Sequence, residues 1–204
     1  MNTPRPHDLL WGMPVSALPN DAPQWAREVL ASGQPVVVRR AGCAPGQVPV
    51  GVRGALREQR LACDMALASV NRKVSPPALR CTQAEGWPAL RALAYVHALL
   101  DATGQAWGPT GGVGYQLATG VEVLHAASDL DLLLHAPEPL SRCQARALLK
   151  QLDGAPCRVD VQLQTPTGAI ALREWASGAS RVLLKTAQGA RLVGHPWLAE
   201  AYAA

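Results

Sequence analysis

The sequence contains no phenylalanine, so its aromatic packing must depend on six tryptophans and three tyrosines. Its five cysteines are widely spaced and include no Cys-x-x-Cys pair, which argues against a disulfide framework or a zinc site. No apolar run approaches the roughly 20 residues that cross a bilayer, and the first residues lack the apolar core of a signal peptide. We therefore expect a cytoplasmic protein with no membrane partner.

A strong excess of one charge is also missing. The 19 Lys and Arg against 15 Asp and Glu leave a net charge of +4, a weak footprint for a nucleic-acid-binding protein, and we expect no nucleic-acid partner. The excess lies in residues 1–90, which hold 10 basic and 6 acidic side chains, whereas residues 91–204 hold nine of each. An anionic ligand or partner should therefore be attracted mostly by the first half.

The 204 residues, 49% of them hydrophobic, suit one large domain or two small ones. Turn-forming residues with few periodic apolar positions occupy the stretch from Val74 to Pro88, which predicts a domain boundary. We expect an α+β protein with an N-terminal α/β substrate- or partner-binding domain, residues 1–85, and a catalytic domain, residues 86–204, whose mixed sheet is flanked by helices. The predicted helices cover 24–32, 88–103 and 141–153, the last with a Ser141–Gln144 capping box, and the predicted strands cover 35–40, 48–52, 129–134, 158–163 and 181–186.

Two carboxylates, Asp129 and Asp131, stand two residues apart at the start of an apolar stretch. In a strand this spacing puts both on one face, where they repel each other unless a cation lies between them. A third acid, Asp160, lies on the polar face of the next predicted strand. Oxygen ligands of this kind favour Mg²⁺ or Mn²⁺. The alternative is that these aspartates only end strands and face water.

A glycine-rich segment, residues 108–120, precedes the acids. Gly111 and Gly112 place no Cβ between the backbone N–H groups and a ligand, and a helix that begins near Gly112 would direct its first N–H groups at a phosphate. The segment has no Gly-Lys-Ser/Thr, so it is not a P-loop, and no Gly-x-Gly-x-x-Gly follows a clear strand, so a dinucleotide fold is not indicated.

The order of glycine pair, Asp-x-Asp and later Asp resembles the nucleotidyltransferase superfamily that includes DNA polymerase β. In that superfamily a Gly-Gly or Gly-Ser pair opens a helix, and three acids hold two metal ions for attack on an α-phosphate. The resemblance implies that Gly111 and Gly112 are the pair, and that Asp129, Asp131 and Asp160 are the catalytic, metal-binding acids.

More specific strings are similar to those of the malonate decarboxylase holo-[acyl-carrier-protein] synthases, also called phosphoribosyl-dephospho-CoA transferases. They extend over nearly the whole chain: RPHDLLWG at 5–12, VPVGVRG at 48–54 with Arg57 and Arg60, GVGYQLATG at 112–120, SDLDLLL at 128–134, RVDVQL at 158–163 and VLLKT at 182–186.

This resemblance implies transfer of a phosphoribosyl-dephospho-CoA group from 2'-(5''-triphosphoribosyl)-3'-dephospho-CoA to a serine of an apo acyl-carrier subunit of malonate decarboxylase, with release of pyrophosphate. It also implies dependence on Mg²⁺. Two alternatives stay open: another superfamily member that uses ATP on a small molecule or protein, and a carrier-binding subunit without turnover.

Basic residues must meet the phosphates of such a substrate. We predict this role for Lys185, at the end of an apolar strand, and for Arg53, Arg57 and Arg60, although each could instead be an ordinary solvated side chain. Together with Arg39 and Arg40, these arginines give the segment from 39 to 60 five positive charges against one acid, Glu58. The same segment could therefore bind an acidic carrier protein.

The sequence leaves two interpretations open for each of two further residues, His7 and Trp107. His7 beside Asp8 could belong to an oriented base, or to a structural turn in which the imidazole satisfies a backbone group. Trp107 could stack on a base or pack in the core.

Overall fold

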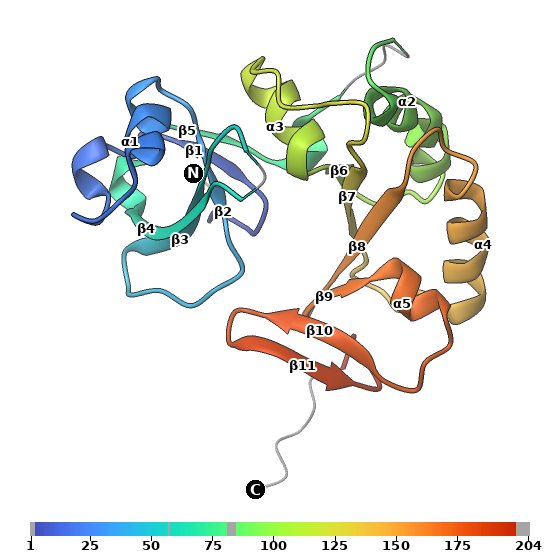
Figure 1. The fold of residues 1–204 in the computed structure, drawn as a ribbon. Helices are drawn as coiled ribbons and strands as arrows, with labels where there is room; N and C mark the ends of the chain where they lie inside the picture. The colour runs from blue at the N-terminus through green and yellow to red at the C-terminus, as the bar shows by residue number, and fades with distance from the viewer. Residues whose placement is uncertain (1–2, 57, 81–84, 199–204) are drawn as a thin grey trace, which may run out of the picture.

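The computed structural model describes residues 3–56, 58–80 and 85–198. Its helices and strands form two sheets with covering helices, which confirms the predicted two-domain α+β class (Figure 1). We call the part from β1 to β5 the N-terminal module and the part from α2 to β11 the C-terminal module. Among the helices of these described ranges, none is long and apolar enough to cross a lipid bilayer.

The N-terminal module is an antiparallel sheet in the order β4-β3-β2-β1-β5. Alternating apolar residues of the central strands form its core with Ala26 and Leu30 of the helix α1. Its strands are β1 (Leu9–Trp11), β2 (Val36–Val38), β3 (Gln47–Arg53), β4 (Arg60–Ala66) and β5 (Arg72–Val74), and its helical elements are α1 (Gln24–Ala31) and the 3₁₀ turns η1 (Val15–Ala17) and η2 (Leu67–Ser69).

The C-terminal module is a mixed sheet in the order β11-β10-β9-β8-β7-β6, in which β7 and β8 are parallel. The strands are β6 (Trp107–Pro109), β7 (Leu130–His135), β8 (Val159–Thr165), β9 (Gly168–Ala171), β10 (Val182–Thr186) and β11 (Gly189–Val193). The helices are α2 (Pro88–Asp101), α3 (Gly111–Thr119), α4 (Arg142–Leu152) and α5 (Leu172–Ala176), and η3 (Pro76–Ala78) lies between the two sheets in the chain.

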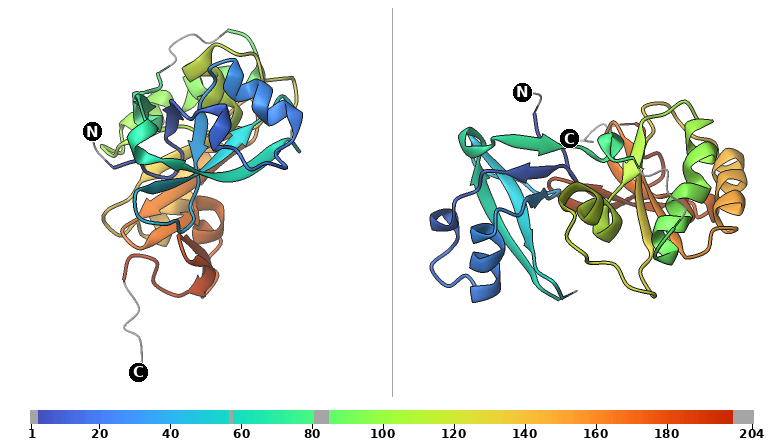
Figure 2. Two further views of the ribbon diagram at one scale, coloured as in Figure 1. Left: turned by 90° about the vertical axis from the view of Figure 1, so that its left-hand side faces the viewer. Right: turned by 90° about the horizontal axis from the view of Figure 1, so that it is seen from above.

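The two faces of the mixed sheet differ in chemistry. On one face, Leu130 and Leu132 of β7 and Val159 and Val161 of β8 are buried in one core with α2 and α4. Asp131 and Asp160 point to the opposite face, as the period of two along a strand requires. Figure 2 shows α2 and α4 on the side away from the N-terminal module, so the polar face of the sheet is turned toward that module.

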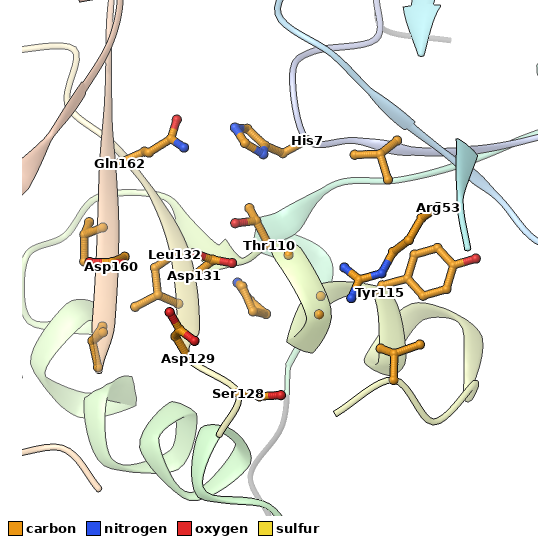
Figure 3. A pocket seen from close by; sticks show the side chains of 18 of the residues that line it. His7, Arg53, Thr110, Tyr115, Ser128, Asp129, Asp131, Leu132, Asp160 and Gln162 are labelled. Carbon is orange, nitrogen blue, oxygen red and sulfur yellow. The ribbon is translucent and has the colours of Figure 1, made fainter. Parts of the chain in front are cut away.

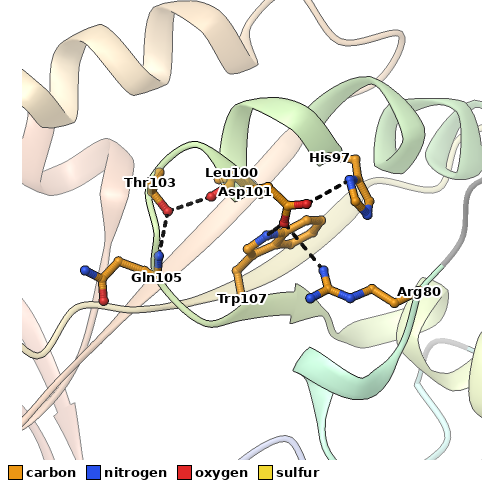
Figure 4. Close-up of polar contacts among 7 residues, drawn as sticks. All are labelled: Arg80, His97, Leu100, Asp101, Thr103, Gln105 and Trp107. Carbon is orange, nitrogen blue, oxygen red and sulfur yellow. Dashed lines mark hydrogen bonds and ion pairs between the residues drawn. The ribbon is translucent and has the colours of Figure 1, made fainter.

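The C-terminal end of α2 is tied to β6 by Asp101 (Figure 4). Its carboxylate accepts a hydrogen bond from Trp107 Nε1 at 2.7 Å and lies 3.2 Å from His97 Nδ1 and 3.6 Å from Arg80 Nη1. Trp107 is 2% exposed, and its ring meets that of His97 edge-on. Trp107 therefore packs in the core, and its alternative role in stacking on a base is wrong.

Candidate active site

A cavity of about 950 Å³ lies between the polar face of the mixed sheet and the N-terminal module (Figure 3). Both modules line it: Arg53 and Arg60 are among the residues from the first sheet, and α3, β7, β8 and β10 supply several of the others. The structure thus brings together all the predicted site residues that it describes: Arg53, Arg60, Gly111, Gly112, Asp129, Asp131, Asp160 and Lys185. The remaining one, Arg57, lies outside the described residues.

Asp131 and Asp160 lie on the parallel pair β7 and β8, and Asp129 immediately precedes β7. Asp131 and Asp160 are directly opposite each other in the register, and Asp129 lies two residues before Asp131. Enclosure in the cavity raises the pKa of Asp131, and the negative charges of Asp129 and Asp160 raise it further. The site therefore concentrates negative charge that a cation would offset.

The donors suit Mg²⁺ or Mn²⁺, because carboxylate oxygen is the ligand that these ions prefer. Within the described ranges, however, no group of three or more His, Cys, Asp or Glu side chains is arranged to hold a metal. One reason is that Asp160 is paired with Arg158, whose Nε lies 3.0 and 3.1 Å from its two carboxylate oxygens. Because Mg²⁺ commonly needs one or two protein carboxylates plus phosphate and water, Asp129 and Asp131 fit such an ion even with Asp160 paired.

Gly111 is required by the position of Asp131. It has a φ of 57°, in the left-handed region, and a Cβ at this position would collide with the carboxylate of Asp131. The preceding residue, Thr110, donates its backbone N–H to the carbonyl oxygen of Asp131 at 2.8 Å. These contacts fix the first turn of α3 against β7 beside the acids.

The start of α3 lies at the glycine pair, close to the helix start predicted near Gly112. The helix begins at Gly111, and no side-chain hydrogen bond from its N-cap residue, Thr110, satisfies its first N–H groups. Gly112 follows without a Cβ and lines the cavity. Free N–H groups at the positive end of a helix favour a phosphate oxygen there.

Arg53 reaches this helix from the N-terminal module. Its guanidinium lies 5.5 Å from the ring centre of Tyr115, and its Nη2 would be 3.5 Å from a Cβ on Gly112. Its Nε is buried and has no hydrogen-bond partner among the described residues. Burial lowers the pKa of Arg53, and Arg60, directly opposite across the hairpin of β3 and β4, lowers it further. A buried unpaired donor beside a second cation suits an anionic ligand.

The pair His7 and Asp8 does not form an oriented base through its aspartate. Asp8 is 2% exposed and accepts a hydrogen bond from the backbone N–H of Arg5, with Lys73 Nζ at 3.9 Å. The imidazole of His7 instead faces the cavity, as does the side chain of Gln162, which acts to raise the pKa of the ring (Figure 3).

Sequence reasoning assigned no role to Arg158, Tyr115 or Gln162, which also line the cavity. A signal existed for Gln162, since it lies on the same face of the strand as Asp160. No local pattern marks Tyr115, because its neighbours Arg53 and Gln34 come from the other module.

Two family profiles match consecutive parts of the chain. Residues 5–76 match the phosphoribosyl-dephospho-CoA transferase MdcG N-terminal domain, and residues 74–196 match the C-terminal domain of the same transferase. The chain belongs to the phosphoribosyl-dephospho-CoA transferase family.

Relatives in this family are similar over almost their whole length. A phosphoribosyl-dephospho-CoA transferase of Pseudomonas putida (strain GB-1) is 66% identical over 204 residues, 100% of both chains. Those of Azotobacter vinelandii and Pseudomonas aeruginosa are 60% and 51% identical, each over 95% of this chain and 94% of the relative. No solved structure matched the chain. As a member of this family, the protein is an enzyme of the transferase class.

Proposed function

We propose that this enzyme transfers the phosphoribosyl-dephospho-CoA group from 2'-(5''-triphosphoribosyl)-3'-dephospho-CoA to a serine of the apo acyl-carrier subunit of malonate decarboxylase, with release of pyrophosphate. The names of its relatives support the identity of the transferred group, phosphoribosyl-dephospho-CoA. The observation that carries the proposal is that Arg53 from one module lies close to Gly112 and Asp131 of the other, an arrangement that would allow a phosphate to bind directly beside the acids. The order of these motifs also supports membership of the polymerase-β-like superfamily.

The reaction is a displacement at the α-phosphorus of the donor. The bond from the serine oxygen to phosphorus forms, the bond from phosphorus to the pyrophosphate oxygen breaks, and the serine proton passes to water. Asp129 and Asp131 would hold a Mg²⁺ ion. When bound, such an ion neutralises phosphate charge and makes the hydroxyl more acidic.

The protein's own groups would then position the triphosphate. The N–H groups at the start of α3 would bind oxygens of the phosphate chain, and Gly111 and Gly112 allow the backbone to approach it. Arg53 would donate its free Nε and its terminal N–H groups to the leaving pyrophosphate. Arg60 lowers the pKa of Arg53, so a donor phosphate bound beside Arg53 would relieve the repulsion between these two cations.

Asp160 would have a dependent role. In this structure it is paired with Arg158, whose side chain is 65% exposed, so the pair can open at small cost. If Asp160 were released from Arg158, it would add a third carboxylate for binding a metal ion. While the pair is formed, only Asp129 and Asp131 are free to bind one.

The proposal is tested by the mass of the apo carrier subunit after incubation with the enzyme and Mg²⁺, with the triphosphoribosyl donor and with ATP in parallel. We expect a mass increase equal to the phosphoribosyl-dephospho-CoA group with the first donor and none with ATP. An adenylyl group on the carrier, or no modification with the triphosphoribosyl donor, would overturn the proposal.

A further inference from the structure

A second group of cations lines the cavity away from Arg53. A hollow of about 490 Å³ opens between the end of β2 and the hairpin of β10 and β11, and it shares His7, Gln162 and Lys185 with the main cavity. Arg39 and Arg40, which follow β2, line its side on the N-terminal module. The cavity therefore continues past the acids into a second basic region.

Two of these cations, Arg40 and Lys185, have no acidic partner among the residues that the structure describes. Arg40 Nη2 donates instead to Gln164 Oε1 at 2.7 Å, and Gln164 Nε2 donates to the carbonyl oxygens of Thr165 and Gly168, both at 2.9 Å. Neutral hydrogen bonds thus hold the guanidinium in place and leave its charge uncompensated.

The imidazole of His7 lies in this positive field. Burial, together with the charges of Arg40 and Lys185, lowers its pKa to about 4, although the side chain of Gln162 and the charge of Asp8 oppose that shift. At neutral pH the ring is therefore uncharged, and it has an N–H that can donate to a ligand. The balance around His7 is the one expected of an anion site without its anion.

The backbone at His7 adopts a strained conformation, which indicates that its side chain has a function. Arg5 to Asp8 form a turn closed by the N–H of Asp8 on the carbonyl oxygen of Arg5, at 3.0 Å, with Pro6 second and His7 third. His7 has a φ of 75°, which this turn position normally assigns to glycine. A bulky side chain held there points to a functional need for it.

We propose that Arg40, Lys185 and His7 form a second anion site, which binds the diphosphate that joins adenosine to pantetheine in dephospho-CoA. This inference rests on the proposed function, in which the donor carries two polyphosphate groups on one adenosine. The triphosphate must lie beside the acids, near Arg53 and α3, because its α-phosphorus reacts there. The diphosphate then needs a second cationic region of the same cavity, and Arg40 supplies a planar fork and Lys185 a point charge.

Binding of dephospho-CoA to the full-length enzyme, measured by calorimetry without Mg²⁺, tests this site separately from turnover. We expect Arg40→Met and Lys185→Met each to weaken binding at least tenfold. The matched control is Lys150→Met on the exposed side of α4, which should leave the affinity unchanged. No binding by the wild type, or equal affinities in all four proteins, would overturn the inference.

Inorganic triphosphate distinguishes the two cationic regions. We expect Arg53→Met to weaken triphosphate binding tenfold or more and to leave dephospho-CoA binding within twofold. The reverse pattern, with Arg40→Met acting on triphosphate alone, would contradict the assignment. If dephospho-CoA binding depends on Arg40 while no transfer to the carrier occurs, the anion site stands and the proposed function fails; if transfer occurs without that dependence, only the anion site fails.

Nuclear magnetic resonance of the His7 ring gives a readout that a merely structural role would not change. Saturation with dephospho-CoA should raise the pKa of His7 by at least one unit, because the diphosphate offsets the charges of Arg40 and Lys185. The variant His7→Asn lacks the imidazole signal and so identifies it in the spectrum. Because asparagine tolerates a positive φ, this variant should keep its Tm while it binds dephospho-CoA severalfold more weakly. An unmoved His7 titration at saturation would contradict the site.

Discussion

At the residue scale, Asp131 carries the largest conflict between stability and function. Its raised pKa means that the folded protein holds the proton more tightly than the unfolded chain, so ionisation at neutral pH lowers the free energy of unfolding. We expect Asp131→Asn to abolish transfer, by at least a thousandfold, while its Tm at pH 7 equals or exceeds that of the wild type. Mass spectrometry of the carrier and thermal unfolding measure the two effects.

Metal-dependent unfolding provides a control for that variant. Addition of Mg²⁺ should raise the Tm of the wild type and not that of Asp131→Asn. Near-normal turnover by Asp131→Asn, or an equal Mg²⁺ shift in both proteins, would remove Asp131 from the metal site.

Gly111 and Gly120, at the two ends of α3, separate backbone strain from collision. Both have a positive φ, 57° and 74°, but only at Gly111 does an added Cβ meet another group, the carboxylate of Asp131. We expect Gly120→Ala to cost about 1 kcal/mol of unfolding free energy and to keep activity. Gly111→Ala should cost more and lose at least a hundredfold in transfer rate. Denaturant unfolding with carrier assays measures both, and equal activities would contradict the proposed contact.

His7 should make the fold sensitive to moderate acid. Because its pKa is about 4 when folded and about 6.5 when unfolded, its contribution is complete above pH 6.5 and is lost as the pH falls toward 4. Between pH 7.5 and pH 5, the wild type should lose about 1–2 kcal/mol more unfolding free energy than His7→Asn. Urea unfolding at the two pH values measures this difference, and parallel losses in both proteins would show that His7 is not buried as a neutral ring.

At the scale of elements, long periodic segments were predictable, whereas most short strands, β2 excepted, were not. The helices α1, α2 and α4 and the strands β2, β3, β7, β8 and β10 match the predicted ranges within a few residues. The missed strands include β1, β6 and β9, which have three or four residues and owe their conformation to paired neighbours. β4, with seven residues, was missed because exposed and partly buried positions alternate along it without a clear apolar face.

The capping box of α4 could be predicted from the sequence because its contacts join residues only three positions apart. Ser141 Oγ accepts from the N–H of Gln144 at 3.2 Å, and Gln144 Oε1 accepts from the N–H of Ser141 at 2.9 Å. We expect Ser141→Ala to cost about 1 kcal/mol of unfolding free energy, with unchanged transfer, because Ser141 does not line the cavity. Chemical denaturation measures the loss; a change in transfer rate with stability intact would contradict this separation.

At the scale of the whole molecule, the sequence identified most acidic and basic groups of the site but not how they meet. The Asp-x-Asp spacing predicts a shared face, and the parallel register of β7 and β8 then places Asp160 beside Asp131. The hydrogen bonds from Tyr115 to Gln34 and from Arg40 to Gln164 join residues from different modules. Such contacts follow from how the two sheets dock, and no local period encodes them.

The central claim is that Asp129 and Asp131 hold divalent ions against the triphosphate of the donor. The most direct test is a crystal structure with Mg²⁺ and a donor analogue in which a methylene group replaces the α,β-bridging oxygen. The account predicts at least one ion bound by both carboxylates and by an α-phosphate oxygen, with Arg53 on the outer phosphates. Ions bound elsewhere, with the two aspartates directed away from the phosphate chain, would contradict it.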